Sequence, residues 1–330
     1  MRLILHVGTH KTATSAMQVF ARDNRKFLET QGLFYPLDPA GRWPNHNWLA
    51  KHVRHAFPRR HRRVRNLLDT ISSYPEDSTV LISGEDFSAS CDRLRLWHGL
   101  DRPDFRQLQS RYLKRLARLL HDHDVEIILV FRRADEYAQS LYQTLIAEDR
   151  YRGSFDSFLQ FSAPLFDYAA QRQAFEAAFA TVTTLSFHLP RTGMVENMFE
   201  KMGFPSHLLS AQRRNVSIDA RLTYWMAASN LAGKTPPAVV SQQRNFCKSD
   251  AARTLFPHFG LATFWRSADD RKRFHNSAAK DISPKLFPEC QATARHHAAL
   301  SDAERDRVAK AFRRWQLSAP DEQEQSVRAS

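Results

Sequence analysis

The sequence predicts an α/β protein whose core is a doubly wound parallel sheet. Four short apolar runs rich in β-branched residues predict the strands, and helical patterns separate them. The runs cover residues 3–7, 79–83, 126–131 and about 181–187. This alternation of strands and helices is typical of a sheet that is covered by helices on both faces.

The clearest helical pattern lies between the second and third predicted strands. Its apolar residues recur at helical spacing and form one stripe, made of Phe105, Leu108, Tyr112, Leu113, Leu116, Leu119 and Leu120. Another helix follows the fourth strand, and Gly203 and Pro205 provide its stop signal. One face of that helix is lined by Met194, Val195, Met198, Phe199 and Met202.

The length of 330 residues allows one large domain with an ample core. We expect the α/β core to cover residues 1–215. Only helical patterns and loops are visible beyond it, so residues 216–330 are predicted to form a helical C-terminal extension of the same domain. Residues 318–330 are polar and lack periodicity, which predicts a frayed tail.

Cysteine usage and hydropathy favour a cytoplasmic protein. The chain has three cysteines and no Cys-x-x-Cys spacing, which favours free thiols in a reducing compartment. No stretch reaches the ~20 apolar residues of a membrane span, and the apolar run after Met1 is too short for a secretory signal. We therefore expect no transmembrane segment.

The net charge of +13 gives the protein a field that attracts anions. The densest positive cluster runs from Arg54 to Arg65. A solvated helix face and a surface that holds an acidic substrate both explain such a cluster. Its role stays open at this point.

The strongest functional motif follows the first strand and reads Gly8-Thr9-His10-Lys11-Thr12-Ala13-Thr14-Ser15. A loop that opens a helix offers backbone N–H groups and a positive helix end to an anion. Lys11 adds a full charge, and Thr12, Thr14 and Ser15 add hydroxyl donors. The motif is not a Walker A loop, because that pattern places a glycine immediately before its lysine. Capping of the following helix is the alternative explanation.

A second motif begins where the third predicted strand ends. Arg132 closes that strand, and Ser140 follows it by 140 − 132 = 8 positions. An arginine at a strand end and a serine two turns into the next helix can converge on one phosphate. Each residue type is common at such a place, so the motif gains weight only beside the first one.

Together the two motifs resemble those of sulfotransferases that use 3′-phosphoadenosine 5′-phosphosulfate (PAPS). Lys11-Thr12-Ala13-Thr14-Ser15 is similar to the Lys-Thr-Gly-Thr-Thr core of the family's 5′-phosphosulfate loop, with Ala13 in place of the glycine. Arg132 and Ser140 match the family's 3′-phosphate motif, although Ala134 stands where a proline is frequent. A weaker match is Arg214-Asn215-Val216-Ser217, which is similar to a basic Asn-x-Ser segment that closes over the nucleotide in bacterial members.

The resemblance implies a P-loop-like sulfotransferase with PAPS as its co-substrate and no required metal. Lys11 is then the catalytic cation, and Arg132 and Ser140 hold the 3′-phosphate. The remaining donor-binding residues are Gly8, Thr12, Ala13, Thr14, Ser15, Arg214, Asn215 and Ser217. Bacterial carbohydrate sulfotransferases suggest a glycan hydroxyl as the acceptor, and no nucleic-acid partner is implied.

The acceptor hydroxyl needs a general base, for which the sequence offers two candidates. Glu85 comes first because it ends the second predicted strand, where carbohydrate sulfotransferases often have a Ser-x-Glu-like element. His46 comes second, in the loop Trp43-Pro44-Asn45-His46. A helix cap or an ion pair would also explain Glu85, and an ordinary loop position would explain His46.

Two alternatives of other classes remain. One is a P-loop phosphotransferase, which the spacing from Gly8 to Lys11 disfavours. The other is a basic nucleic-acid-binding protein that uses the Arg54 to Arg65 cluster.

Overall fold

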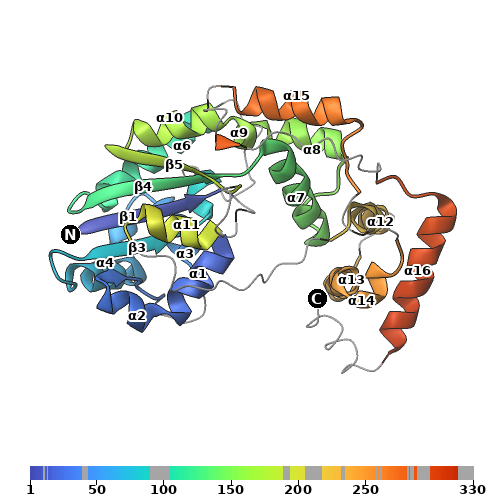
Figure 1. Cartoon of the computed structure of the whole chain (residues 1–330), viewed down its shortest axis with the longest axis horizontal. Coiled ribbons are helices and arrows are strands. Elements are labelled where there is room, and N and C mark those ends of the chain that lie inside the picture. Colours follow the sequence, from blue (N-terminus) through green and yellow to red (C-terminus); the bar gives the residue numbers. More distant parts are fainter. Residues whose placement is uncertain are drawn as a thin grey trace. The chain divides into compact units, whose positions relative to one another are not determined.

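The computed structural model describes residues 1–9, 12, 14–38, 44–89, 104–188, 194–204, 218–231, 235–256, 259, 262–280, 282, 286–287 and 298–318. Its central element is a parallel sheet of five strands in the order β2-β3-β1-β4-β5, with helices on both faces (Figure 1). The strands are β1 (Arg2–Gly8), β2 (Leu33–Phe34), β3 (Thr79–Ser83), β4 (Asp124–Phe131) and β5 (Thr181–Ser186). The predicted α/β class is confirmed.

All four predicted strands are present, and the sequence pattern missed only the edge strand β2 among the described residues. β2 has two residues, which pair with Thr79 and Val80 of β3. A segment this short shows no periodicity that could predict it.

β1 is the central strand because it pairs with β3 on one side and with β4 on the other. Its register sets His6 opposite Ser83 of β3 and Gly8 opposite Val130 of β4. All strands run in parallel, so their carboxyl ends lie at one edge of the sheet. Ligands bind at this edge in open α/β sheets.

One face of the sheet is covered by helices α1 (Thr14–Asp23), α2 (Arg25–Thr30) and α11 (Met194–Lys201). Their apolar side chains share one core with the sheet, which includes Ile4, Met17, Phe20, Leu81, Ile128, Val130, Val195, Met198 and Phe199. Gly203, just beyond α11, has a φ of 91°, which fits its predicted role as a stop signal.

The opposite face carries helices α6 (Phe105–Leu119) and α10 (Tyr168–Glu176) (Figure 1). The predicted stripe of α6 is buried, and α10 contacts β4, β5 and α6. Phe131 of β4 stacks on Tyr168 of α10 with ring centroids 4.3 Å apart. Further helices of this unit are α3 (Asn47–Val53), α4 (Arg62–Ser72), α5 (Asp86–Ala89) and α9 (Ala163–Phe166), with a 3-10 turn at Pro58–Arg60.

The chain forms two compact units that interleave in the sequence. The first unit comprises Met1–Ala134, Phe161–Arg213 and Asn276–Pro288, and the second comprises Asp135–Gln160, Arg214–His275 and Glu289–Ser330. One passage from the first unit to the second follows Arg213. Residues 135–160 precede this passage and nevertheless pack with the second unit. Residues 276–288 follow it and pack with the first unit.

The described part of the second unit is helical. Its elements are α7 (Ala134–Ala147), α8 (Phe155–Phe161), α12 (Ala220–Leu231), α13 (Pro237–Lys248), α14 (Asp250–Arg253), α15 (Ala268–Ala278) and α16 (Asp302–Leu317). Aromatic side chains form its core, as where Tyr142 meets Phe264 at 5.0 Å and Trp225 meets Phe312 at 5.3 Å. Of the predicted frayed tail at residues 318–330, all but Ser318 lies outside the described residues.

In the part of the chain that the structure describes, no helix combines the length and the hydropathy that crossing a membrane requires.

Candidate functional site

The candidate site is built at the carboxyl ends of β1, β3 and β4, within the first unit. The backbone N–H of Thr9 donates to the Val130 carbonyl at 3.0 Å, and the Thr9 hydroxyl donates to the same oxygen at 3.1 Å. On the other side of β1, the N–H of Gly84 donates to the His6 carbonyl at 3.1 Å. The loops that follow the three strands therefore begin side by side.

The loop after β1 folds tightly over Gly8. A Cβ atom at Gly8 would lie 2.5 Å from the Thr12 hydroxyl oxygen and still closer to that of Thr14. The Thr12 hydroxyl donates to the Thr9 carbonyl at 2.5 Å, and the Thr12 and Thr14 hydroxyl oxygens are 3.2 Å apart. Only a glycine at position 8 leaves room for both hydroxyls, so the structure brings these three predicted residues together.

The first turn of α1 follows this loop. Thr12 and Thr14 are buried, whereas Ser15 is exposed. Met17 and Phe20 anchor the helix in the core, which fixes its positive N-terminal end near the end of β1. Lys11 and Ala13 lie outside the described residues.

Glu85 lies between β3 and α5 and is half-buried. Its carbonyl accepts hydrogen bonds from the Ser88 N–H at 3.2 Å and the Ser88 hydroxyl at 2.8 Å, so the residue also starts the turn of α5. The negative charge of its carboxylate affects the pKa of His6 in the neighbouring strand β1. Burial lowers the pKa of His6 to about 3, and the negative charge of Glu85 opposes this shift without overcoming it.

The His46 side chain forms hydrogen bonds to two backbone groups, one through each ring nitrogen. Its Nδ1 accepts a hydrogen bond from the Ser83 N–H at 3.1 Å, and its Nε2 lies 2.7 Å from the Pro36 carbonyl, to which it donates. The ring is 1% exposed, and burial lowers its pKa to about 4. In this structure both ring nitrogens of His46 are engaged in hydrogen bonds to the backbone.

A polar chain beneath the loop was not predicted from the sequence. Nδ1 of His6 lies 2.9 Å from the Ser83 hydroxyl oxygen, and the Gln18 amide donates to that hydroxyl at 3.1 Å. All three side chains are buried. The available signal was a histidine inside an otherwise apolar strand, two residues after Ile4 and therefore on the same face.

Arg132 follows β4 and belongs to the first unit. Its guanidinium lies over the Phe187 ring, 5.0 Å from the centroid, and its carbonyl accepts a hydrogen bond from the Tyr168 hydroxyl at 2.7 Å. Ser140 lies in α7 and belongs to the second unit, where its carbonyl accepts from the Thr144 hydroxyl at 3.0 Å. Both residues are half-buried. Arg214, Asn215 and Ser217 lie outside the described residues.

The basic cluster from Arg54 to Arg65 begins just after α3 and includes the 3-10 turn and the start of α4. Two of its arginines hold the fold together. Arg59 pairs with Asp122 at 3.0 Å, and Arg63 donates to Asp38 at 2.9 Å. Arg63 also lies over the Trp48 ring, 4.2 Å from the centroid.

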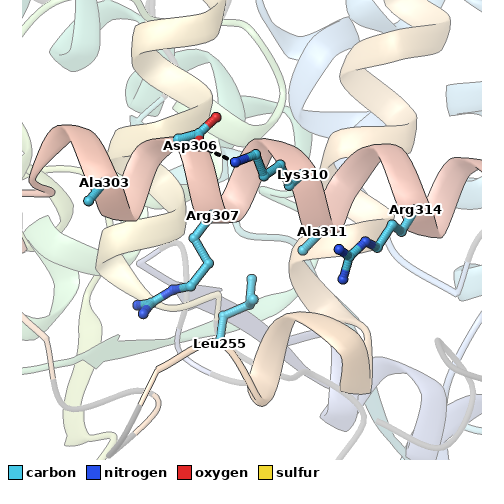
Figure 2. A pocket seen from close by; sticks show the side chains of 7 residues that line it. All are labelled: Leu255, Ala303, Asp306, Arg307, Lys310, Ala311 and Arg314. Carbon is cyan, nitrogen blue, oxygen red and sulfur yellow. Dashed lines mark ion pairs between the residues drawn. The ribbon is translucent and has the colours of Figure 1, made fainter.

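Two other features bear on ligand binding. Among the residues described, no group of three or more His, Cys, Asp or Glu side chains is arranged to hold a metal ion. A pocket of ≈ 330 Å³ lies in the second unit beside α16, and Asp306 and Lys310 on its rim form an ion pair at 2.7 Å (Figure 2). Its lining contains none of the predicted site residues.

No protein-family model and no curated protein sequence matches this chain. Among solved structures, the chain is similar to the crystal structure of a sulfotransferase from Alicyclobacillus acidocaldarius, with a TM-score of 0.41 and 12% sequence identity. The similarity covers 72% of this chain and 93% of that chain.

Proposed function

We propose that this protein is a PAPS-dependent sulfotransferase that transfers a sulfuryl group to a hydroxyl acceptor. The observation that carries the proposal is the register of β1, β3 and β4, which sets the loop after Gly8 beside the strand ends that lead to Glu85 and Arg132. The loop from Gly8 to Ser15, which we call the anion loop, thus shares one edge of the sheet with a carboxylate and an arginine.

The residues of the loop suit the phosphosulfate group of the donor. Gly8 leaves the space beside it to the hydroxyls of Thr12 and Thr14. The N-terminal end of α1 adds backbone donors and a partial positive charge. Lys11, three residues after Gly8 in the sequence, supplies the full charge, and Ala13 and Ser15 complete the loop.

The 3′-phosphate of the donor distinguishes PAPS from other adenine nucleotides. We assign it to Arg132 and Ser140, by charge and by hydroxyl donation respectively. Arg214, Asn215 and Ser217 are assigned to the segment that covers the nucleotide. These roles rest on the resemblance of the motifs and on the place of Arg132 at the end of β4.

The reaction requires positioning and charge stabilisation, as phosphoryl transfer does. The acceptor oxygen forms a bond to sulfur, the bond from sulfur to the phosphate oxygen breaks, and 3′,5′-adenosine bisphosphate leaves. Lys11 neutralises the charge that grows on the leaving oxygen. Glu85 takes the proton of the acceptor hydroxyl, and His46 supports the site by fixing the end of β3. No step requires a metal.

A glycan hydroxyl is the acceptor class that we propose, within a cytoplasmic protein. The test is to incubate the protein with PAPS labelled in its sulfuryl group and a panel of glycan, lipid and aryl hydroxyl acceptors. We expect label in a glycan together with an equal amount of 3′,5′-adenosine bisphosphate. Transfer to none of the acceptors, with turnover of ATP instead, would favour a phosphotransferase.

A further inference from the structure

His6 is a buried histidine that the proposed reaction does not use. The ring is 0% exposed, and within the described residues its Nε2 has no hydrogen-bond partner. Buried polar atoms are paired in the great majority of cases, so an atom like this one calls for an explanation. The explanation depends on which ring nitrogen carries the proton.

The neighbours of His6 identify its tautomer. The Gln18 amide donates to the Ser83 hydroxyl oxygen at 3.1 Å and approaches the Ser83 carbonyl at 3.4 Å. The Ser83 oxygen therefore acts as an acceptor towards Gln18, and Nδ1 of His6 at 2.9 Å is the acceptor among the described residues that the Ser83 proton can reach. Since Nδ1 accepts, the proton of the neutral ring is on Nε2. Burial keeps the ring neutral, with its pKa lowered to about 3.

The Nε2–H of His6 lies beneath the anion loop. It is 3.6 Å from the point that a Cβ atom of Gly8 would occupy, and the hydroxyl oxygens of Thr12 and Thr14 crowd the same point. In this structure both hydroxyl protons are used inside the loop. Thr12 donates to the Thr9 carbonyl, so the contact of 3.2 Å between the two hydroxyls must use the proton of Thr14.

We propose that His6 is a positioning residue of the anion loop, whose Nε2–H orients the hydroxyls of Thr12 and Thr14 towards a bound phosphate or phosphosulfate group. When such an anion binds, the hydroxyl protons turn to it, and a hydroxyl oxygen accepts from Nε2. The result is one chain of donors that runs from Gln18 through Ser83 and His6 to the loop, in which each bond strengthens the next. The identity of the anion as PAPS rests on the proposed function.

The first test compares anion affinity across three variants. His6→Phe keeps the ring shape and loses the donor, whereas His6→Gln keeps an amide N–H near the position of Nε2. Ile4→Val, two residues earlier on the same face of β1, is the control for a general disturbance of the core. Calorimetry with inorganic pyrophosphate and with 3′,5′-adenosine bisphosphate provides the readout.

We expect both anions to bind His6→Phe about tenfold more weakly than wild type, since the threonine hydroxyls that face the anion lose the donor that orients them. His6→Gln and Ile4→Val should stay within about twofold. Equal affinity of His6→Phe and wild type for pyrophosphate would overturn the proposal. If wild type binds pyrophosphate as tightly as 3′,5′-adenosine bisphosphate, the result would contradict the proposed function. It would leave the comparison of His6 variants intact.

The second test does not depend on ligand affinity. Nitrogen-15 chemical shifts of the His6 ring should show the Nε2–H tautomer in wild type, and the Nε2–H signal should move when pyrophosphate is added. Ser83→Ala removes the donor to Nδ1 and breaks the chain of hydrogen bonds, so pyrophosphate should bind several-fold more weakly. An Nδ1–H tautomer in the wild-type protein would rule the proposal out.

Discussion

The backbone N–H of Ser83 donates a hydrogen bond to Nδ1 of His46 at 3.1 Å, and the backbone N–H of His46 donates to the Ser83 carbonyl at 2.8 Å. The ring also donates to the Pro36 carbonyl. His46→Ala leaves two buried backbone groups without their partner, so we expect a loss of about 2–4 kcal/mol in the free energy of unfolding. Urea unfolding measures it, with the exposed His55→Ala as a control that should change by less than about 0.5 kcal/mol.

Stability should fall as the pH is lowered from 7 to 5. Burial lowers the pKa of His6 to about 3 and that of His46 to about 4, whereas both titrate near 6.5 in the unfolded chain. The unfolded state therefore takes up protons below pH 6.5 while the folded state stays neutral until about pH 4. Each histidine should lower the free energy of unfolding by about 2 kcal/mol over this interval.

Urea unfolding at pH 7, 6 and 5 measures this dependence. His6→Gln removes one of the two groups, so the contribution of this pair should be halved in that variant. An unchanged pH dependence in His6→Gln would mean that His6 is not held neutral.

Binding of 3′,5′-adenosine bisphosphate should stabilise the protein against heat far more than binding of 5′-AMP. The reason is the 3′-phosphate, which we assign to Arg132 and Ser140. Ligand at about 100 times its dissociation constant adds about 2.7 kcal/mol, which a thermal shift assay detects. Arg132→Ala should abolish the difference, and equal shifts with both nucleotides in wild type would refute the assignment.

Lys11→Ala should lower turnover by roughly a hundredfold or more while the melting temperature stays near that of wild type. The substitution removes the charge that stabilises the leaving oxygen and leaves the sheet and α1 intact. Sulfuryl transfer from labelled PAPS at saturating acceptor is the measurement. Turnover close to wild type would show that the loop has another role.

Glu85→Gln should lower turnover by roughly a hundredfold and leave the dissociation constant of the donor almost unchanged, because the amide keeps the shape and cannot accept the proton. His46→Ala, corrected for its folded fraction, should lose much less activity. A severe loss in His46→Ala with a mild one in Glu85→Gln would reverse the two roles. Weaker donor binding in Glu85→Gln would make Glu85 a scaffold residue.

The strands and the main helices were predictable because their signals are local. Four apolar runs marked β1, β3, β4 and β5, and the spacing of the stripe from Phe105 to Leu120 marked α6. β2 was not predictable, since two residues carry no period and the strand exists only through its pairing with β3. The sequence also could not predict that residues 135–160 belong to the second unit, because this depends on packing against segments far along the chain.

The candidate site was predictable only where a motif is continuous in the sequence. Gly8, Thr12 and Thr14 lie within seven residues, and both threonine hydroxyls lie against Gly8. The contacts of His6 with Ser83 span 77 residues, and they depend on a register that no local pattern encodes. The burial of His46 has the same origin, because a loop position says nothing about the strand that the ring meets.

The interleaving of the two units has a consequence for the order of events on the ribosome. Tyr142 and Phe155 leave the ribosome long before Phe264 and Trp265, against which they pack in the second unit. At 5–20 residues per second, the nascent chain carries these uncovered aromatic rings for on the order of ten seconds. The sheet has all of its strands by then, since β5 ends at Ser186. A fragment cut at residue 215 would make the exposure permanent, so that boundary is a poor place to truncate the gene.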